Sequence, residues 1–278
     1  MPVTDRPAQP ITRLTVLLDR TTSTAEHTLP WAALLARTLN IPLTLLHIVD
    51  PARISEPAEV GIAEASDYLA LVASSLETSV AVSTEVRQGL ASEEWADISR
   101  QQPGTALMLS NGNMGGVGAV FMGDPIGDPI KAIVTPVIVV PASPAATSET
   151  KRIVVGNDGG HASRDALGFA QALATRFEAE LIEVEAIERG SRPDHELLQM
   201  APQISGSRIA LRGPAGPSVL AVARARQADL IVVGARSKRG VFDALLGSTS
   251  DWLVRNSDRP VIIAPEPWLS PQEPRKAT

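Results

Sequence analysis

The chain has 278 residues, of which 44% are apolar, 20% charged and 3% aromatic, a globular composition whose core must be built from Ala, Val, Leu and Ile. It contains no cysteine, which excludes disulfides, thiolate metal sites and cysteine nucleophiles. The net charge of −6 argues against a general nucleic-acid-binding protein. No apolar run is long enough to span a membrane and no signal peptide is visible, so we expect a cytoplasmic location.

The charge is distributed unevenly along the chain. Residues 1–146 carry a net charge of −7, whereas residues 147–278 carry a net charge of +1. An anionic ligand would therefore be held better by the second half. A simpler alternative stays open, in which the charged residues of solvated surfaces differ between the halves without a functional reason.

Strands and helices are expected to alternate twice. In the first half we expect strands at residues 14–19, 43–49, 83–87, 105–110 and 135–141, with helices at 25–39, 60–76 and 93–100. In the second half we expect strands at 152–158, 180–184, 208–212, 229–234 and 259–265, with helices at 163–177, 218–226 and 251–256. This alternation predicts parallel βαβ units, and the nearly continuous apolar strands predict sheets covered on both faces, so each half should be a doubly wound, Rossmann-like α/β domain.

The two halves repeat one another. An offset of 124 residues aligns Pro136 with Pro260 and Gly123 with Gly247. The small residues and prolines of 142–150 are typical of a linker. We therefore predict one domain at 1–144, a second at 150–266 and a flexible tail at 267–278.

Two loops of the second half are expected to meet at a ligand site. Ligands of open α/β sheets bind beyond the carboxyl ends of the strands, which here are followed by residues 156–160 and 234–250. The second loop carries three cationic side chains and then Gly-Ser-Thr-Ser at the start of a helix, where free backbone N–H groups favour an anion. The alternative is that the hydroxyl residues only cap the helix and the glycines shape a turn.

The spacing Gly234-x2-Ser237-x9-Gly247-Ser248 resembles the G-x2-G-x9-G-(S/T) loop of universal stress proteins. The segments 154–159 and 259–265 are also similar to flanking strands of that family. The resemblance covers nearly the whole chain as two tandem domains, and it is stronger in the second. It implies five-stranded, mainly parallel α/β domains, ATP binding in many members and dimerisation through the last strand. Ser237 departs from the family's second glycine, so its Cβ would crowd a phosphate or its hydroxyl would donate to one.

The resemblance also implies a set of binding residues. Asp158 would lie near the adenosine with Gly156 and Asn157 beside it, and Val184 would offer backbone atoms to the adenine. The ribose and phosphates would be held by Gly234, Arg236, Ser237, Gly247, Ser248, Thr249 and Ser250. The implied ligand is ATP, with or without Mg²⁺, or another adenine nucleotide, and no catalytic or protein-bound metal site is predicted.

The first half departs from the family pattern at its own version of this loop. Asp124 stands where Ser248 would meet a phosphate, and a carboxylate 4 Å from a phosphate charge costs about 4 kcal/mol at an effective dielectric near 20. Pro125 stands where Thr249 would give a backbone N–H. No Lys or Arg lies between residues 100 and 131. We therefore predict that the first half is a degenerate structural or regulatory domain.

The remaining polar residues do not predict a dedicated enzyme. The four histidines lack metal-binding spacing, His47 is expected to be a satisfied core or rim residue, and Ser248 has no neighbouring base. We predict a stress-response regulatory protein in which nucleotide orders residues 235–247 and changes a surface seen by an unidentified protein partner. The open alternatives are an interaction scaffold with empty sites and slow ATP hydrolysis at the second site.

The last strand of each half is expected to take part in pairing between sheets. If the family topology applies, residues 137–140 and 261–264 form edge strands, and exposed apolar edges invite pairing. We predict that they pair with each other within the chain or, in self-association, with their equivalents in a second chain.

Overall fold

The computed structural model describes residues 11–20, 22–52, 57–76, 79–102, 104–111, 135–144, 149–187, 207–234 and 248–264. The first half contains β1 (Arg13–Leu17), α1 (Thr22–Leu39), β2 (Leu43–Val49), α2 (Ala58–Ser75), β3 (Val82–Gln88), α3 (Ala91–Gln101), β4 (Thr105–Ser110) and β5 (Val137–Val140). The second half contains β6 (Arg152–Gly156), α5 (His161–Phe177), β7 (Glu180–Ile187), β8 (Arg208–Arg212), α7 (Ala215–Ala225), β9 (Leu230–Gly234), α8 (Ser248–Asn256) and β10 (Val261–Ala264). No helix in these ranges is long and apolar enough to cross a membrane.

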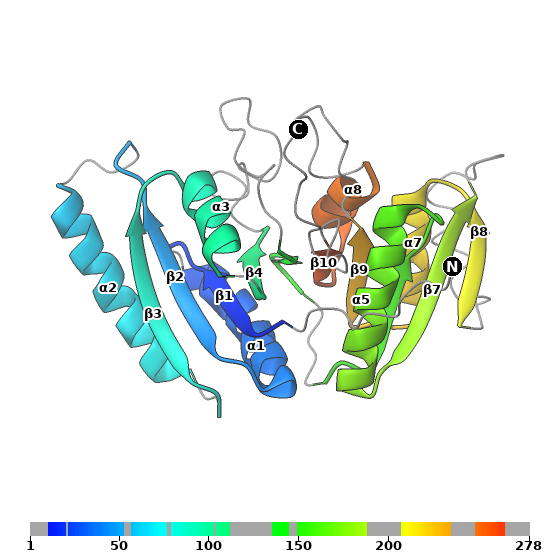
Figure 1. Ribbon diagram of the computed structural model, residues 1–278, viewed down its shortest axis with the longest axis horizontal. Helices are drawn as coiled ribbons and strands as arrows, with labels where there is room; N and C mark the ends of the chain where they lie inside the picture. The colour runs from blue at the N-terminus through cyan, green and yellow to red at the C-terminus, as the bar shows by residue number, and fades with distance from the viewer. Residues whose placement is uncertain are drawn as a thin grey trace, which may run out of the picture.

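The ten strands form one sheet in the order β3-β2-β1-β4-β5-β10-β9-β6-β7-β8. Each half supplies five parallel strands, which confirms the predicted α/β fold class. The halves lie side by side in Figure 1, the first in blue to green and the second in green to red. The two halves therefore share one continuous hydrogen-bonded sheet.

The sheet is continuous because β5 and β10 pair with each other in the antiparallel direction, with Ile138 opposite Ile262. Of the two pairings expected for these strands, the structure contains the one within the chain. Each strand also has a parallel neighbour on its other side, so neither is an edge strand.

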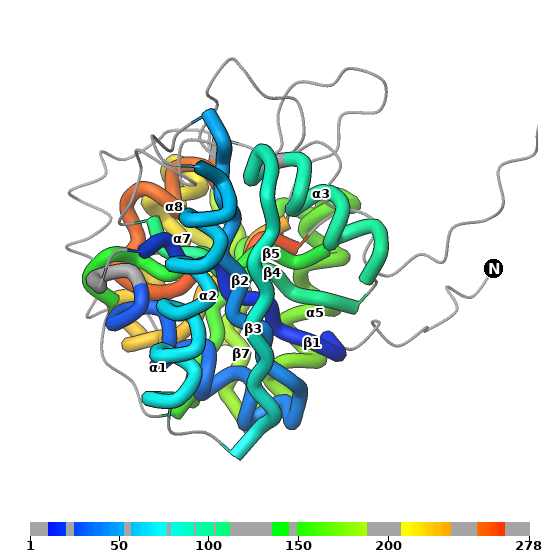
Figure 2. The backbone as a smooth tube through the Cα atoms, turned by 90° about the vertical axis from the view of Figure 1, so that its left-hand side faces the viewer, coloured from blue at the N-terminus to red at the C-terminus, as the bar shows by residue number. Residues whose placement is uncertain are grey.

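Apolar side chains of the strands pack into two hydrophobic cores, one on each face of the sheet. In β4, Ala106 and Met108 belong to the cluster beneath α1, α2 and α5, whereas Leu107 and Leu109 belong to the cluster beneath α3, α7 and α8. Figure 2 shows the edge strand β3 with α2 on one side and α3 on the other. Burial on both faces explains why central strands such as β4 and β9 are apolar at successive positions, whereas the edge strand β8 alternates between exposed and buried residues.

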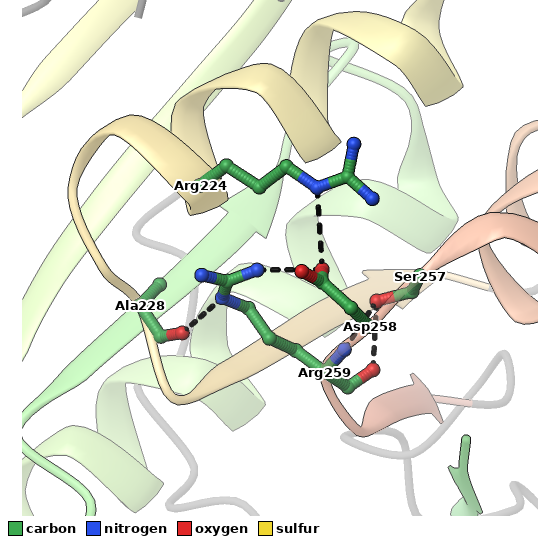
Figure 3. Close-up of polar contacts among 5 residues, drawn as sticks. All are labelled: Arg224, Ala228, Ser257, Asp258 and Arg259. Atoms are coloured by element: carbon green, nitrogen blue, oxygen red, sulfur yellow. Dashed lines mark hydrogen bonds and ion pairs between the residues drawn. The ribbon is translucent and has the colours of Figure 1, made fainter. Parts of the chain in front are cut away.

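A polar cluster fixes the amino ends of β9 and β10 (Figure 3). Arg259 donates from Nε to the Ala228 carbonyl at 2.6 Å and from Nη1 to the Asp258 carboxylate at 2.5 Å. Arg224 of α7 approaches the same carboxylate at 3.4 Å, and the hydroxyl of Ser257 donates to the Arg259 carbonyl at 2.7 Å. Burial alone raises the pKa of Asp258, but the charges of Arg259 and Arg224 and the hydrogen bond from Arg259 outweigh burial and lower it.

We expect Arg259→Ala to lower the free energy of unfolding by about 1.5–3 kcal/mol, because it removes hydrogen bonds made by a mostly buried charged group. A carboxyl with a lowered pKa stabilises the folded chain above its unfolded pKa and loses that contribution as the pH falls through its folded pKa. The difference in the free energy of unfolding between Arg259→Ala and the wild type, measured by urea unfolding, should therefore become smaller as the pH is lowered from 6 to about 3. The control is Arg255→Ala, which breaks an exposed pair with Asp251 and should cost about 0.5 kcal/mol at most. A difference that is independent of pH would contradict this electrostatic account.

Candidate functional site

Three elements of the second half converge at Gly234, the last residue of β9. A Cβ atom on Gly234 would lie 2.3 Å from the carbonyl oxygen of Ala162, which shows how closely the first turn of α5 packs there. On the other side, the hydroxyl of Ser250 in the first turn of α8 donates to the Gly234 carbonyl at 3.1 Å. The amino ends of two helices are thus held at the carboxyl end of one strand. Their unpaired N–H groups and dipoles favour an anion at this edge.

The loop from β6 to α5 is held by its own side chains. Asn157 accepts hydrogen bonds from the Gly159 N–H and the Ser163 hydroxyl, both at 2.9 Å, and donates to Glu183 at 2.8 Å. Asp158 is exposed and accepts the Gly160 N–H at 2.9 Å. The Asn157 side chain therefore shapes the loop, while the Asp158 carboxylate lies at its surface.

Arg164 is a cation of this region that the sequence reasoning did not single out. It lies in the first turn of α5 and donates to the Gly159 carbonyl at 2.6 Å, with its Nη2 3.0 Å from Nδ1 of His161. That turn contains no acidic residue. A cation is unfavourable at the amino end of a helix unless an anion compensates it. The position of Arg164 near the start of an expected helix could therefore have indicated an anion site from the sequence.

Val184 lies within β7 and not at its end, which extends to Ile187. Its side chain is 1% exposed in the core, and its carbonyl accepts the N–H of Asn157 at 2.9 Å. The neighbouring Glu183 is held between Asn157 and Arg208, whose Nε lies 3.6 Å from its carboxylate. The side chain and the carbonyl of Val184 are therefore both used within the fold, and its contact with an adenine stays a prediction.

The rest of the expected phosphate loop is only partly described. Ser248 begins α8, Thr249 is half-buried and Ser250 is 1% exposed. Arg236, Ser237 and Gly247 lie outside the described residues. The structure thus brings together Gly156, Asn157, Asp158, Gly234 and the start of α8.

The corresponding edge of the first half has a different polar arrangement. His47 on β2 is half-buried and forms a hydrogen bond of 2.7 Å through Nδ1 with the Leu18 carbonyl, so its prediction as a satisfied rim residue is confirmed. Burial lowers the pKa of His47 and Arg20 lowers it further, against the opposing effects of the Leu18 carbonyl and Asp19. Arg20 is itself paired with Glu64 of α2. Of the described residues at this edge, neither Arg20 nor His47 therefore offers a free positive charge to an anion, and the sequence-aligned Asp124 and Pro125 lie outside the described residues.

Asn111, just beyond β4, ties the first half to α8. Its Nδ2 donates to the Val254 carbonyl at 2.8 Å, and its Oδ1 accepts the Ala142 N–H at 2.8 Å. The first half therefore contacts the helix whose amino end lies at the candidate site, which is consistent with a structural role for that half.

Comparison with known proteins agrees with this architecture. The sequence pattern of the universal stress protein family matches residues 10–141 and 194–265. A universal stress protein of Mycolicibacterium smegmatis is 26% identical over 274 residues, covering 84% of this chain and 90% of that protein. A universal stress protein of Methanocaldococcus jannaschii is 26% identical over 142 residues, covering 42% of this chain and 83% of that protein.

Solved structures show the same fold. The crystal structure of a universal stress protein from Archaeoglobus fulgidus superposes with a TM-score of 0.70 at 16% sequence identity, covering 92% of this chain and 97% of that one. The family pattern matches well over half of the chain, in one segment from each half of the continuous sheet. The chain therefore belongs to the universal stress protein family.

Proposed function

We propose that the second half binds an adenine nucleotide, ATP with or without Mg²⁺, and that this binding regulates contact with a protein partner. The observation that carries the proposal is the convergence of the first turns of α5 and α8 at Gly234. Two helix amino ends at the carboxyl edge of a parallel sheet form a polar, positively polarised environment suited to phosphate groups.

The charges around this edge support the same proposal. Arg164 adds a positive charge next to the β6–α5 loop, and Arg236 belongs to the loop that joins β9 to α8. Asp158, at the surface of the first loop, is the group we assign to the adenosine end of the ligand. The nucleotide would lie across both loops, with its phosphates at Gly247, Ser248 and Thr249.

The first half would act as a structural or regulatory domain. Within the part of the first half that the structure describes, Arg20 is neutralised by Glu64 and burial favours the neutral form of His47, so these two residues offer a triphosphate little free positive charge. The contact from Asn111 to α8 gives this half a direct connection to the proposed site.

The internal repeat supplies a matched test of this assignment. Gly247→Val should abolish ATP binding in a calorimetric titration, because the added side chain blocks the approach of a phosphate to the backbone. Gly123→Val places the same substitution at the equivalent position of the first half and should leave ATP affinity unchanged. Loss of binding in Gly123→Val with retention in Gly247→Val would overturn the assignment to the second half. Enzyme-dependent, linear phosphate release would identify the protein as an ATPase and not a pure binder.

A further inference from the structure

The pairing of β5 with β10 leaves β3 and β8 as the two edges of the ten-stranded sheet. Figure 2 looks onto the β3 end of the sheet and shows this strand between α2 and α3, with no helix across it. Its sequence, VSTEVRQ, lacks the proline and lysine residues that commonly protect sheet edges from further pairing. Within the part of the chain that the structure describes, no strand pairs with the outer side of β3.

Alternate residues of β3 direct their backbone groups away from the sheet. The Leu43 N–H donates to the Ala81 carbonyl at 2.9 Å, and the Gly89 N–H donates to the Val49 carbonyl at 3.0 Å. Hydrogen bonds to one neighbouring strand come from every second residue, and both of these bonds involve odd-numbered residues at the ends of β3. The outward N–H and C=O groups therefore belong to the even-numbered residues, Val82, Thr84, Val86 and Gln88.

This alternation restricts how a second copy of β3 can pair with the first. Facing residues of an antiparallel pair either exchange both hydrogen bonds or exchange none, so outward-facing residues must lie opposite outward-facing residues. Even-numbered residues of the two copies then face one another, and odd-numbered residues face one another between them. The two-fold axis of such a pair must therefore pass beside one residue, which faces its own equivalent in the second copy.

The charges of β3 select among these registers. An axis at Glu85 would place two carboxylates opposite each other, and an axis at Arg87 would place two guanidinium groups opposite each other, and both arrangements are unfavourable. An axis at Thr84 would place Glu85 opposite Ser83, which carries no charge. An axis at Val86 places Glu85 of each copy opposite Arg87 of the other. The register centred on Val86 is therefore the one that electrostatic complementarity favours.

Arg87 has hydrogen-bond donors left for a contact with a second copy. Its Nε lies 2.6 Å from the Glu85 carboxylate, and its Nη1 lies 3.2 Å from the carboxylate of Glu94 in α3. A guanidinium group has five N–H donors, and Nη2 of Arg87 makes no hydrogen bond within the described ranges. The side chain is 19% exposed, so it is held at the edge of the sheet without using all of its donors.

The opposite edge of the sheet is less suited to pairing with itself. The Glu183 N–H donates to the Ser207 carbonyl at 2.8 Å, so the outward residues of β8 are Arg208, Ala210 and Arg212. An axis at Ala210 would place Arg208 opposite Arg212 of the second copy, and like charges directly opposite are destabilising. Of the two edges, β3 is therefore the one whose sequence complements itself.

We propose that β3 is a docking surface for a second copy of this chain, in a two-fold antiparallel pair centred on Val86. Thr84 and Gln88 of opposite copies would exchange backbone hydrogen bonds, and Glu85 and Arg87 would form cross-strand ion pairs. The contact is built on one strand of seven residues, so the dimer is of the weak, transient class. The interface is independent of the proposed nucleotide site, so either proposal can fail without the other.

The first test measures the association of the full chain. Sedimentation equilibrium from about 1 µM to about 1 mM should show a reversible equilibrium between monomer and dimer. A chain that stays monomeric up to about 1 mM would overturn the proposal. Assembly into open-ended polymers would also overturn it, because polymers require β3 to pair with a different surface and not with itself.

Proline at an outward position identifies the edge that pairs. Thr84→Pro removes an N–H that β2 does not use, so the chain should still fold but dimerise about tenfold more weakly or worse. The matched control is Ala210→Pro, which changes an exposed, outward residue of β8 and should leave dimerisation unchanged. Dimerisation of Thr84→Pro with the affinity of the wild type, or its loss in Ala210→Pro alone, would overturn the assignment to β3.

Two charge variants test the register. Glu85→Arg places two cations opposite each other and Arg87→Glu places two anions opposite each other, so each variant alone should dimerise about tenfold more weakly or worse. In an equimolar mixture of the two variants every cross-strand pair is attractive again, so heterodimers should form with about the affinity of the wild type. Loss of the ion pair between Glu85 and Arg87 within one chain cannot explain such a recovery, because both variants lack that pair in the mixture as well. Unchanged homodimers of the single variants, or a mixture that shows no recovery, would overturn the proposed interface.

Discussion

Gly234→Ala is expected to destabilise the folded chain by about 1–3 kcal/mol or more and to remove ATP binding. The new Cβ would lie 2.3 Å from the carbonyl oxygen and 2.5 Å from the carbonyl carbon of Ala162, and backbone atoms cannot move aside as a side chain can. Relief of this clash requires α5 to move away from β9. That movement would separate the helix amino ends that we assign to the phosphates.

The matched control for this variant is Gly156→Ala, at the carboxyl end of the neighbouring strand β6. Its Cβ would meet Val219 Cγ2 at 3.3 Å, a contact that a small side-chain movement relieves, so we expect a cost of about 1 kcal/mol or less. Urea unfolding of both variants makes the comparison of stability, and ATP titration is applied to Gly234→Ala alone because Gly156 is itself expected beside the adenosine. If Gly234→Ala is as stable as Gly156→Ala, the close packing of β9 against α5 does not hold the site together.

Arg236→Ala should weaken ATP binding by about ten- to a hundredfold, because a charge-assisted contact contributes about 1.5–3 kcal/mol and 1.4 kcal/mol is a factor of ten. Helix dipoles contribute only about 0.3–1 kcal/mol per charge, so a triphosphate needs a cationic side chain as well. The measurement is a titration series with adenosine, AMP, ADP and ATP. Adenosine should lose little affinity because it has no phosphate.

The neighbouring Lys238→Ala is the control for loss of one positive charge from the same loop, and it should weaken ATP binding less than Arg236→Ala does. An equal loss for adenosine and ATP in Arg236→Ala would mean that Arg236 shapes the loop. Unchanged affinity for every ligand in Arg236→Ala would mean that Arg236 lies in a solvated turn and contacts none of them.

Sequence patterns predicted the fold well because its determinants are local. Every strand of the described sheet coincides with an expected strand. The central strands could be predicted from apolar runs, since residues such as Leu107 and Met108 must be apolar for opposite faces of the sheet. The pairing of β5 with β10 was predicted only as one of two options, because an apolar edge does not specify its partner.

The candidate site was less accessible to sequence reasoning because its contacts are formed in three dimensions. Gly234 was expected at the ribose and phosphates, yet the structure also requires glycine there for contact with Ala162, which lies 72 positions earlier in the sequence. Asn157 was expected beside the adenosine, but its side chain is used by Gly159, Ser163 and Glu183.

We propose that this universal stress protein binds nucleotide in one half only, and the number of ATP sites per chain distinguishes this from binding in both halves. Isothermal titration of the full chain with ATP should give a stoichiometry of one, because the second half has Arg164 beside two convergent helix amino ends, and its loop sequence contains Arg236 and Ser248 whereas that of the first half contains Asp124 and Pro125. Two equal sites per chain would contradict the account, as would a chain that binds no adenine nucleotide at all.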